Sequence, residues 1–502
     1  MATSLTTGRP WRVILLFTVP LMIGNVVQQM YHVADTIVVG RLLGVDALAA
    51  VGATGSLLFL LLGFAWGLTS GFAIPTAQAF GARDYAAVRR SVATGAILSG
   101  ITSVILTAGA PFLSEPALIL LQTPPELLAD ATQFTVISFL GAGALMFFNF
   151  LSAVIRAIGD SRTPLIFLVV SCVLNVILVI AAVAWLGLGV AGAALATVIA
   201  QAVSVLLCLE FVRRRIPELH LHRDDWRITR ADVTEHLRLG LPMGFQASII
   251  AIGALIVQVR LNSLGAEAVA AYTAASRVDG LAVALLQSMS LAVSMYVAQN
   301  YGAGRPDRIR RGVVQALYIA VGGAVVLGVL MVALGGPLVR VFVGDAAPDV
   351  VSMAVSMLII NGVSYTALSV LFVTRGALQG LGSAVIPTVT GVVELFARAG
   401  AAIVLGGIMG FVGVAWSNPL AWVCAAVILV PSYLRAHRRL ATMPSAPMEV
   451  TPTTPIALVG PVDGSMNVEA IVTQPVRLPQ TSSRVRRALR PRRPERTRVR
   501  DR

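Results

Sequence analysis

The chain has 502 residues, of which 57% are apolar and only 12% are charged, and its mean hydropathy is +0.83. An ordinary soluble domain is about 25% charged, so this composition excludes a soluble globular protein and predicts membrane-spanning helices. The net charge of +14 could suggest nucleic-acid binding, but eleven arginines lie in the last 26 residues, and we therefore exclude nucleic acid as a partner of the main body.

Apolar segments long enough to cross a membrane recur along the chain. A bilayer core needs roughly 20 apolar residues per helix, and lipid cannot satisfy unpaired backbone groups, so helices are expected. We predict an all-α integral membrane protein with twelve transmembrane helices, at about 13–39, 47–72, 91–113, 131–155, 164–186, 189–211, 240–261, 268–298, 313–334, 350–373, 386–407 and 411–434.

The first span carries Asn25, Gln28, His32 and Asp35, which are spaced three, four and three residues apart. This spacing places them in one stripe along a helix. Polar groups inside a span are costly and are candidates for function. We take Asp35 as a candidate cation-coupling residue, and Gln28 and His32 as candidates for a substrate cavity. The alternative is a structural stripe that hydrogen-bonds a neighbouring helix.

Four later spans each contain one polar residue that we also treat as a substrate-cavity candidate. Taken singly, such residues more often join helices by hydrogen bonds than bind ligands. They are Asn149, Asn175, Gln258 and Tyr365.

Two further spans contain charged residues. Arg277 and Asp279 are two residues apart and do not face each other on a helix, so each is expected to pair with another helix or to line the substrate cavity. Glu394 and Arg398 are four apart in the order that favours a helical ion pair. They form either a structural pair or a cation-coupling site in which Glu394 exchanges Arg398 for a proton, a sodium ion or a cationic substrate.

The last part of the chain, 436–502, is rich in proline and threonine and then in arginine. Such a composition predicts a disordered cytoplasmic tail. The tail either attaches to anionic lipid or is solvated without a specific role.

The two halves of the chain resemble each other at an offset of 221 residues. Gln-Ala-Phe-Gly-Ala at 78–82 returns as Gln-Asn-Tyr-Gly-Ala at 299–303, and Leu-Gly-Val-Asp-Ala at 43–47 returns as Leu-Gly-Ala-Glu-Ala at 264–268. A repeat of this length in a membrane protein predicts two homologous lobes with a cleft between them. The predicted parts are a cytoplasmic N-terminus at 1–12, a six-helix lobe at 13–212, a cytoplasmic linker at 213–239, a second six-helix lobe at 240–435, and the tail.

The arginines predict the orientation. Between and beside the spans, 22 arginines fall on one side of the membrane, and only Arg41, Arg260 and Arg340 fall on the other. The positive-inside rule places the 22, and both termini, in the cytoplasm. We therefore expect a multi-pass protein of the plasma membrane. Six spans per half return the chain to its starting side, so the repeat is parallel.

No motif for catalysis or for a cofactor is present. There is no Walker A loop, no paired-cysteine metal motif and no convincing nucleophile triad. We expect a protein that is not an enzyme, that holds no cofactor or metal, and that acts as a monomeric carrier driven by an ion gradient, with H⁺ or Na⁺ as the coupling ion.

Several motifs occur in an order that resembles the MATE family, the multidrug and toxic compound extrusion transporters. The similar segments are 33–40, 77–82, 188–194, 298–303 and the Glu-Leu-x-x-Arg motif at 394–398, within about residues 10–435. The resemblance implies two six-helix lobes around a V-shaped cleft. It also implies efflux of small cationic or amphipathic compounds in exchange for H⁺ or Na⁺.

Asp35 matches the first-helix acid to which the resemblance assigns cation coupling. Many members of the family carry an acid at the position of Val179, and some carry one at the position of Ile250. The acid that the sodium-coupled members use is missing from the span at 350–373. We therefore favour proton coupling, in which protonation of Asp35 accompanies rocking of the two lobes.

Two other carriers were weighed. A flippase for lipid-linked saccharides or other amphipathic lipids, from the same broader superfamily, is the alternative; it would be expected to show extra spans and a more cationic cleft. A major-facilitator carrier would carry a different loop signature after the second span, which residues 80–85 do not match.

Overall fold

The computed structural model describes residues 4–121, 123–343 and 348–445. All regular secondary structure in these ranges is helical. The first half contains α1 (Pro10–Leu43), α2 (Val45–Gly81), α3 (Tyr85–Leu120), α4 (Pro125–Leu140), α5 (Ala142–Ala157), α6 (Arg162–Ile180), the π-helical turn η1 (Ala181–Trp185) and α7 (Gly189–Arg215). The second half contains α8 (Arg230–Asn262), α9 (Ala266–Gly302), α10 (Pro306–Val343), α11 (Pro348–Gly380), α12 (Val385–Met409), α13 (Phe411–Ala415) and α14 (Ser417–Ala441).

The helices confirm the predicted membrane architecture. In the described ranges, eleven helices are long and apolar enough to cross a membrane, and α4 with α5, bent by 49°, makes a twelfth span. The bend lies at Gly141, where an added Cβ would overlap the side chain of Val198 on α7. A glycine therefore lets this broken span approach its neighbour closely.

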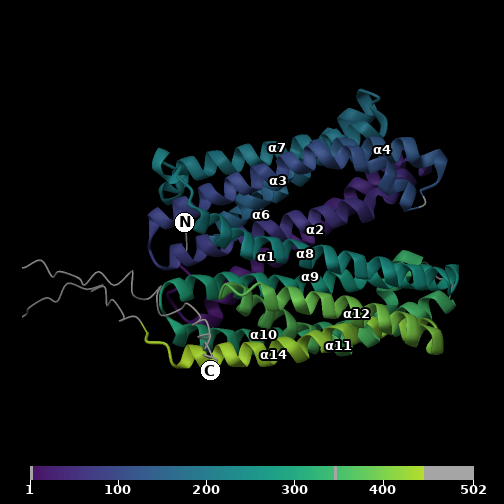
Figure 1. The fold of residues 1–502 in the computed structure, drawn as a ribbon. Coiled ribbons are helices and arrows are strands. Elements are labelled where there is room, and N and C mark those ends of the chain that lie inside the picture. Colours follow the sequence, from purple (N-terminus) through teal and green to yellow (C-terminus); the bar gives the residue numbers. More distant parts are fainter. Residues whose placement is uncertain (1–3, 122, 344–347, 446–502) are drawn as a thin grey trace, which may run out of the picture. The chain divides into compact units, whose positions relative to one another are not determined.

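The helices form two groups, which we call the N-lobe (α1–α7) and the C-lobe (α8–α14). Figure 1 shows α3, α4, α6 and α7 on one side, α10, α11, α12 and α14 on the other, and α1, α2, α8 and α9 between them. Most contacts between the lobes are made by α2 with α8 and α9, and by α1 with α9 and α10. Smaller contacts join α3 to α8, α2 to α11 and α5 to α9. We call the end of the bundle where α1 begins and where α2 and α9 end the N-terminal face.

The most extensive contact between lobes uses glycines. Gly67 and Gly71 of α2 face α8. A Cβ added to Gly71 would lie 2.6 Å from the Cα of Gly240, and a Cβ added to Gly67 would overlap the carbonyl oxygen of Met243. Small residues at every fourth position allow two helix backbones to approach in this way. The contact therefore depends on the absence of side chains.

Glycines also explain why the repeat is readable in the sequence. Gly44 joins α1 to α2 with φ of 92°, and Gly265 joins α8 to α9 with φ of 103°, exactly one repeat later. Gly189 and Gly410 are related in the same way, with φ of 57° and 59°. Positive φ is readily adopted only by glycine, so the two halves share the residues that their common turns require.

Two expectations about boundaries were wrong. Arg375 lies beyond the predicted span at 350–373, but the structure places it inside α11, where it is buried. Residues 436–441, which were assigned to the tail, belong to α14. Residues 446–502, which hold most of the expected tail, lie outside the described residues.

A linker of two short turns, η2 (Pro217–Leu219) and η3 (Arg223–Trp226), joins the lobes. Asp225 of this linker is buried and accepts hydrogen bonds from Arg89 Nε on α3 (3.1 Å) and from the backbone N–H of His222 (2.8 Å). The α8 helix then begins with a capping box between Thr229 and Asp232, which satisfies its first backbone donors.

Candidate functional site

The predicted stripe on α1 is described only in part. His32 and Asp35 lie on this helix, but their side chains are outside the described residues. The side chain of Gln28 is exposed. Asn25 donates hydrogen bonds through Nδ2 to the carbonyl oxygen of Ala284 (2.9 Å) and to Ser288 Oγ (2.8 Å) on α9. At Asn25, therefore, the stripe joins the N-lobe to the C-lobe.

A second polar group lies inside the N-lobe. Asn175 of α6 donates through Nδ2 to Thr197 Oγ1 of α7 at 3.0 Å, and the hydroxyl of Tyr31 on α1 donates to the same oxygen at 3.4 Å. The Oδ1 atom of Asn175 is buried without a hydrogen-bond partner. An unpaired buried acceptor costs about 1–3 kcal/mol, so this oxygen is a candidate ligand for a proton donor or a cation.

The C-lobe contains a buried acid with neutral partners. Asp279 of α9 accepts two hydrogen bonds at Oδ1, from the hydroxyl of Tyr365 (2.7 Å) and from Nδ2 of Asn361 (3.0 Å), both on α11. Asp279 is 7% exposed, and the other two side chains are fully buried. Among the described residues, no arginine lies within ion-pair distance of Asp279.

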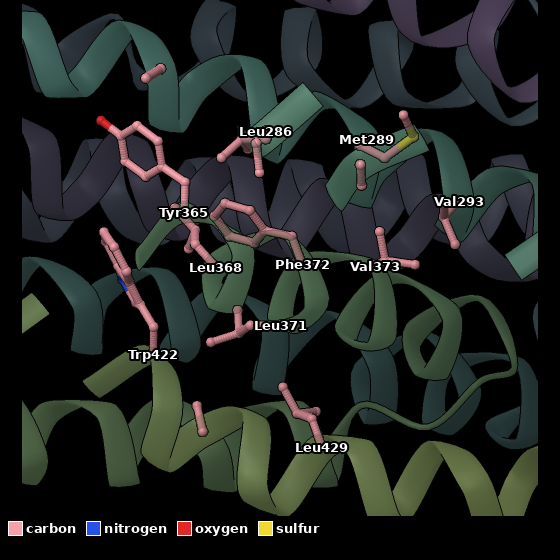
Figure 2. Packing of buried hydrophobic residues seen from close by; sticks show 14 of the residues in the cluster. Leu286, Met289, Val293, Tyr365, Leu368, Leu371, Phe372, Val373, Trp422 and Leu429 are labelled. Atoms are coloured by element: carbon pink, nitrogen blue, oxygen red, sulfur yellow. The ribbon is translucent and has the colours of Figure 1, made fainter. Parts of the chain in front are cut away.

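The tyrosine that binds this buried acid lies at the edge of an apolar cluster. Figure 2 shows Tyr365 at the edge of a cluster that includes Leu368, Phe372 and Trp422, with its hydroxyl directed away from them. The rings of Tyr365 and Trp422 lie 6.3 Å apart between centroids. A charged carboxylate in such a place is costly without a cation, and Oδ1 of Asn361 is a further unpaired acceptor nearby. The arrangement is therefore suited to holding a proton or a small cation.

The other buried acid of the C-lobe is paired with an arginine. The predicted partner of Glu394 was Arg398, but the structure pairs Glu394 of α12 with Arg375 of α11. Both side chains are about 5% exposed. Arg375 reaches Glu394 because α11 continues beyond the predicted end of its span.

Arg398 lies apart from this ion pair. It is buried, its Nε atom has no hydrogen-bond partner, and one of its terminal nitrogens would lie 3.3 Å from a Cβ added to Gly253 on α8. In the described part of the chain no carboxylate lies within ion-pair distance of it. Arg398 therefore carries a buried positive charge without a direct counter-ion.

Arg277 is separated from Asp279, as its spacing predicted. Its side chain is exposed, whereas that of Asp279 is buried. Arg277 lies seven residues before Ala284, which accepts a hydrogen bond from Asn25 of α1. Seven residues are close to two turns, so Arg277 is on the side of α9 that faces the N-lobe.

The remaining cavity candidates form bonds within their own helices. Asn149 donates to the carbonyl oxygen of Leu145, and Gln258 donates to Oδ1 of Asn262. Of the predicted site residues, the structure brings Asp279 and Tyr365 together. Asn149 and Gln258 do not contact this pair.

Two glutamines of the repeat motif join the lobes, which was not predicted. Gln78 at the end of α2 donates to the carbonyl oxygen of Gly380 at the end of α11 (3.0 Å). Gln299 at the end of α9 donates to the carbonyl oxygen of Ala157 at the end of α5 (2.7 Å). Each glutamine thus binds the other lobe, and the recurrence of the motif was the signal that could have identified them.

The segment before α1 binds beside these glutamines. The backbone N–H of Leu5 donates to Oε1 of Gln299 (2.9 Å), and Nδ2 of Asn300 donates to the carbonyl oxygen of Leu5 (3.2 Å). Arg308 donates to the carbonyl oxygen of Gly8 (2.8 Å). The N-terminal face is therefore closed by three connections between the lobes.

The acids of the two halves do not correspond. At the offset of 221 residues, Leu58 stands where Asp279 lies, and Ile256 stands where Asp35 lies. The backbone follows the repeat, whereas the candidate proton sites do not.

Comparisons with known proteins agree with this fold. A family model described as MatE matches residues 20–181 and 242–404. The chain is 28% identical to the probable multidrug resistance protein YpnP of Bacillus subtilis, over 76% of this chain and 85% of that protein. It is 25% identical to the multidrug export protein MepA of Staphylococcus saprophyticus, over 84% of this chain and 93% of that protein.

Solved structures show the same architecture. A MATE crystal structure in complex with MaL6 superposes with a TM-score of 0.82 at 23% identity, over 88% of this chain and 99% of the other. An outward-facing multidrug resistance MATE transporter of the MOP superfamily superposes with a TM-score of 0.81, also at 23% identity. At this identity the likeness concerns the fold.

Proposed function

We propose, since this chain belongs to the MatE family, that it is a secondary active antiporter that exports cationic or amphipathic compounds, drugs among them, in exchange for protons. The printed names of its relatives, a probable multidrug resistance protein and a multidrug export protein, support this substrate class. The observation that supports the proton as the coupling ion is the buried acid Asp279, whose hydrogen-bond donors are all neutral.

The proposed site of action is the plasma membrane, with the N-terminal face in the cytoplasm. The uneven distribution of arginines along the sequence supports this orientation. In this orientation Gln78, Gln299 and the segment before α1 close the cytoplasmic side. Opening toward the cytoplasm requires these hydrogen bonds to break.

The proposed coupling uses one acid in each lobe. Asp35 is the acid of the N-lobe, and the unpaired oxygen of Asn175 belongs to the same lobe. Asp279 is the acid of the C-lobe. Protonation removes its charge, so Tyr365 and Asn361 no longer stabilise a carboxylate and the packing of α9 on α11 can change. Release of the proton on the other side restores the first arrangement.

One observation favours the alternative of a flippase for lipid-linked saccharides or similar lipids. Arg277 is exposed on the side of α9 that faces the N-lobe. A guanidinium there attracts a phosphate and repels a cation. The substrate's charge is therefore the property that separates the two functions.

Transport in proteoliposomes tests the proposal. We expect efflux of a cationic dye when a pH gradient is applied alone, no efflux with a sodium gradient alone, and loss of pH-driven efflux in Asp35→Asn. The Asp307→Asn variant, in which the acid lies in the first turn of α10, serves as the matched control. Dye efflux by Asp35→Asn at the rate of the unmodified protein would refute the proposed role of this acid. Movement of a phosphorylated lipid without dye transport would favour the flippase.

A further inference from the structure

A cavity of about 1000 Å³ opens at the N-terminal face, away from Asp279 and its partners. Its walls are the segment 4–9, the first two turns of α1, and residues 159–163, which form the end of the loop after α5 and the start of α6. Three elements that are distant in the sequence therefore form one pocket. Its volume is at the upper end of the range of about 300–1,000 Å³ that is common for ligand sites.

The charge of this pocket is positive and is not neutralised locally. Arg9, Arg12 and Arg162 line it, and their side chains are exposed. Within the described ranges, none of the three has a carboxylate within ion-pair distance. Three guanidinium groups around one cavity provide donors for phosphate oxygens in paired geometry.

The one acid in the wall is already occupied by other donors. Asp160 accepts from the backbone N–H groups of Arg162 and Thr163 at Oδ1, both at 3.0 Å, and from the hydroxyl of Thr163 at Oδ2 (2.7 Å). Asp160 thus satisfies the free backbone donors at the start of α6. It is directed at the helix and leaves the arginines without a partner.

The same pocket has an apolar wall. Trp11, Val13, Leu16 and Phe17 line it, and Trp11 and Leu16 are 41% and 54% exposed. Tryptophan is enriched where a membrane protein meets the lipid headgroups. An inorganic anion would satisfy the arginines but would leave this apolar surface in water, whereas a lipid offers a charged head and an apolar chain.

We propose that this cavity binds the headgroup of an anionic phospholipid, with Arg9, Arg12 and Arg162 holding the phosphate and Leu16 and Trp11 contacting the start of the acyl chains. The segment that forms one wall is also attached to the C-lobe through Leu5 and Gly8. A bound headgroup therefore stabilises the N-terminal segment in the position that joins the two lobes.

Lipid binding to the full-length protein tests this inference. Delipidated protein in detergent micelles would be titrated with phosphatidylglycerol or phosphatidylcholine, and retained lipid would be counted by native mass spectrometry. We expect preferential retention of phosphatidylglycerol, and at least a tenfold weaker affinity in the triple variant Arg9→Gln, Arg12→Gln and Arg162→Gln. The control triple variant, Arg213→Gln, Arg215→Gln and Arg438→Gln, removes the same charge from exposed positions outside the cavity and should retain the lipid.

Two further measurements complete the test. Arg12→Lys keeps the charge but loses the paired donors, so we expect an intermediate affinity, even if the triple variant proves unstable. Inorganic phosphate at millimolar concentration should not displace the lipid. Equal loss in the two triple variants, unchanged retention in the cavity variants, or displacement by inorganic phosphate alone would each overturn the assignment.

Discussion

Asp279 and Glu394 are both buried acids of the C-lobe, but the charges of their partners differ. Glu394 pairs with Arg375, whereas Asp279 is bound only by Tyr365 and Asn361. A buried ion pair is costly to break, because removing one partner leaves an unpaired charge. Glu394 is therefore suited to holding α12 against α11, whereas Asp279, which has only neutral partners, is the proposed proton site.

Replacing Asp279 with asparagine is expected to abolish pH-driven efflux with little loss of stability. Asparagine is of similar size and still offers an oxygen to the hydroxyl of Tyr365, so the change in stability should be within about 1 kcal/mol. Dye efflux and thermal unfolding of the same preparation check both parts. Efflux that persists at the normal rate would show that the C-lobe acid takes no part in coupling.

The sequence supplied candidate site residues but not the contacts between them. Asp279 and Tyr365 were both predicted as candidates because polar groups inside spans are costly. Their contact joins helices that are 86 residues apart in the chain, and one sequence contains no record of which helices pack together. The predicted pair of Glu394 with Arg398 relied on local spacing, and the contact with Arg375 on the neighbouring helix replaced it.

At the scale of elements, most spans could be predicted because length and hydropathy determine them. Their ends could not, since helices continue beyond the membrane wherever capping groups and packing allow. The bend between α4 and α5 and the π-helical turn after α6 also left no clear pattern in hydropathy. The close contact of α2 with α8 depends on glycines at every fourth position of α2, and one sequence does not show which helix packs against them.

The ion pair between α11 and α12 gives an element-scale prediction. Arg375→Gln or Glu394→Gln alone leaves one buried charge, which is expected to destabilise the protein by about 3–5 kcal/mol. The double variant removes both charges and should lose much less. Thermal unfolding in detergent measures the three variants. Additive losses in the double variant would mean that the two side chains are not energetically coupled.

The stability that the linker between the lobes contributes is expected to fall at acidic pH. Burial raises the pKa of Asp225, but the backbone N–H of His222 and the charge of Arg89 outweigh it and hold the pKa below its ordinary value near 3.8. A group whose pKa is lowered by folding stabilises the folded protein at pH values above its ordinary pKa. This stabilisation is lost as the pH falls through the pKa of the folded state.

The comparison of unmodified protein with Asp225→Asn measures this effect. We expect the unmodified protein to unfold at a higher temperature at pH 7, and the difference to shrink below about pH 4 as the carboxylate is protonated. A difference that stayed constant down to pH 3 would contradict a role for the charge of Asp225.

At the scale of the whole molecule, the lobes meet most closely at the N-terminal face. Gly81 and Gly302 are related by the repeat, and an added Cβ on either would overlap a backbone carbonyl of the other lobe, at Gln299 and Gln78 respectively. The contact exists only because both positions are glycine. The repeat was predicted from the sequence, but not that its two copies touch each other.

Gly81→Ala is expected to shift the molecule toward states in which the two lobes are apart at the N-terminal face. Spin labels at Ala86 and Asp307, on the first turns of α3 and α10, would report a longer distance by double electron–electron resonance. Gly109→Ala on α3 serves as the control, because an added Cβ there meets no other atom within 4 Å. An unchanged distance distribution in Gly81→Ala would show that the contact does not control opening.

The presence of one candidate proton site in each lobe, at positions that the repeat does not relate, has an electrical consequence. If Asp35 and Asp279 each carry one proton inward while one monovalent cation leaves, every cycle moves a net positive charge into the cell. A membrane potential of 100 mV, negative inside, then adds about 2.3 kcal/mol to the driving force. Such an exporter would continue to work in cells whose internal and external pH are equal, powered by voltage alone.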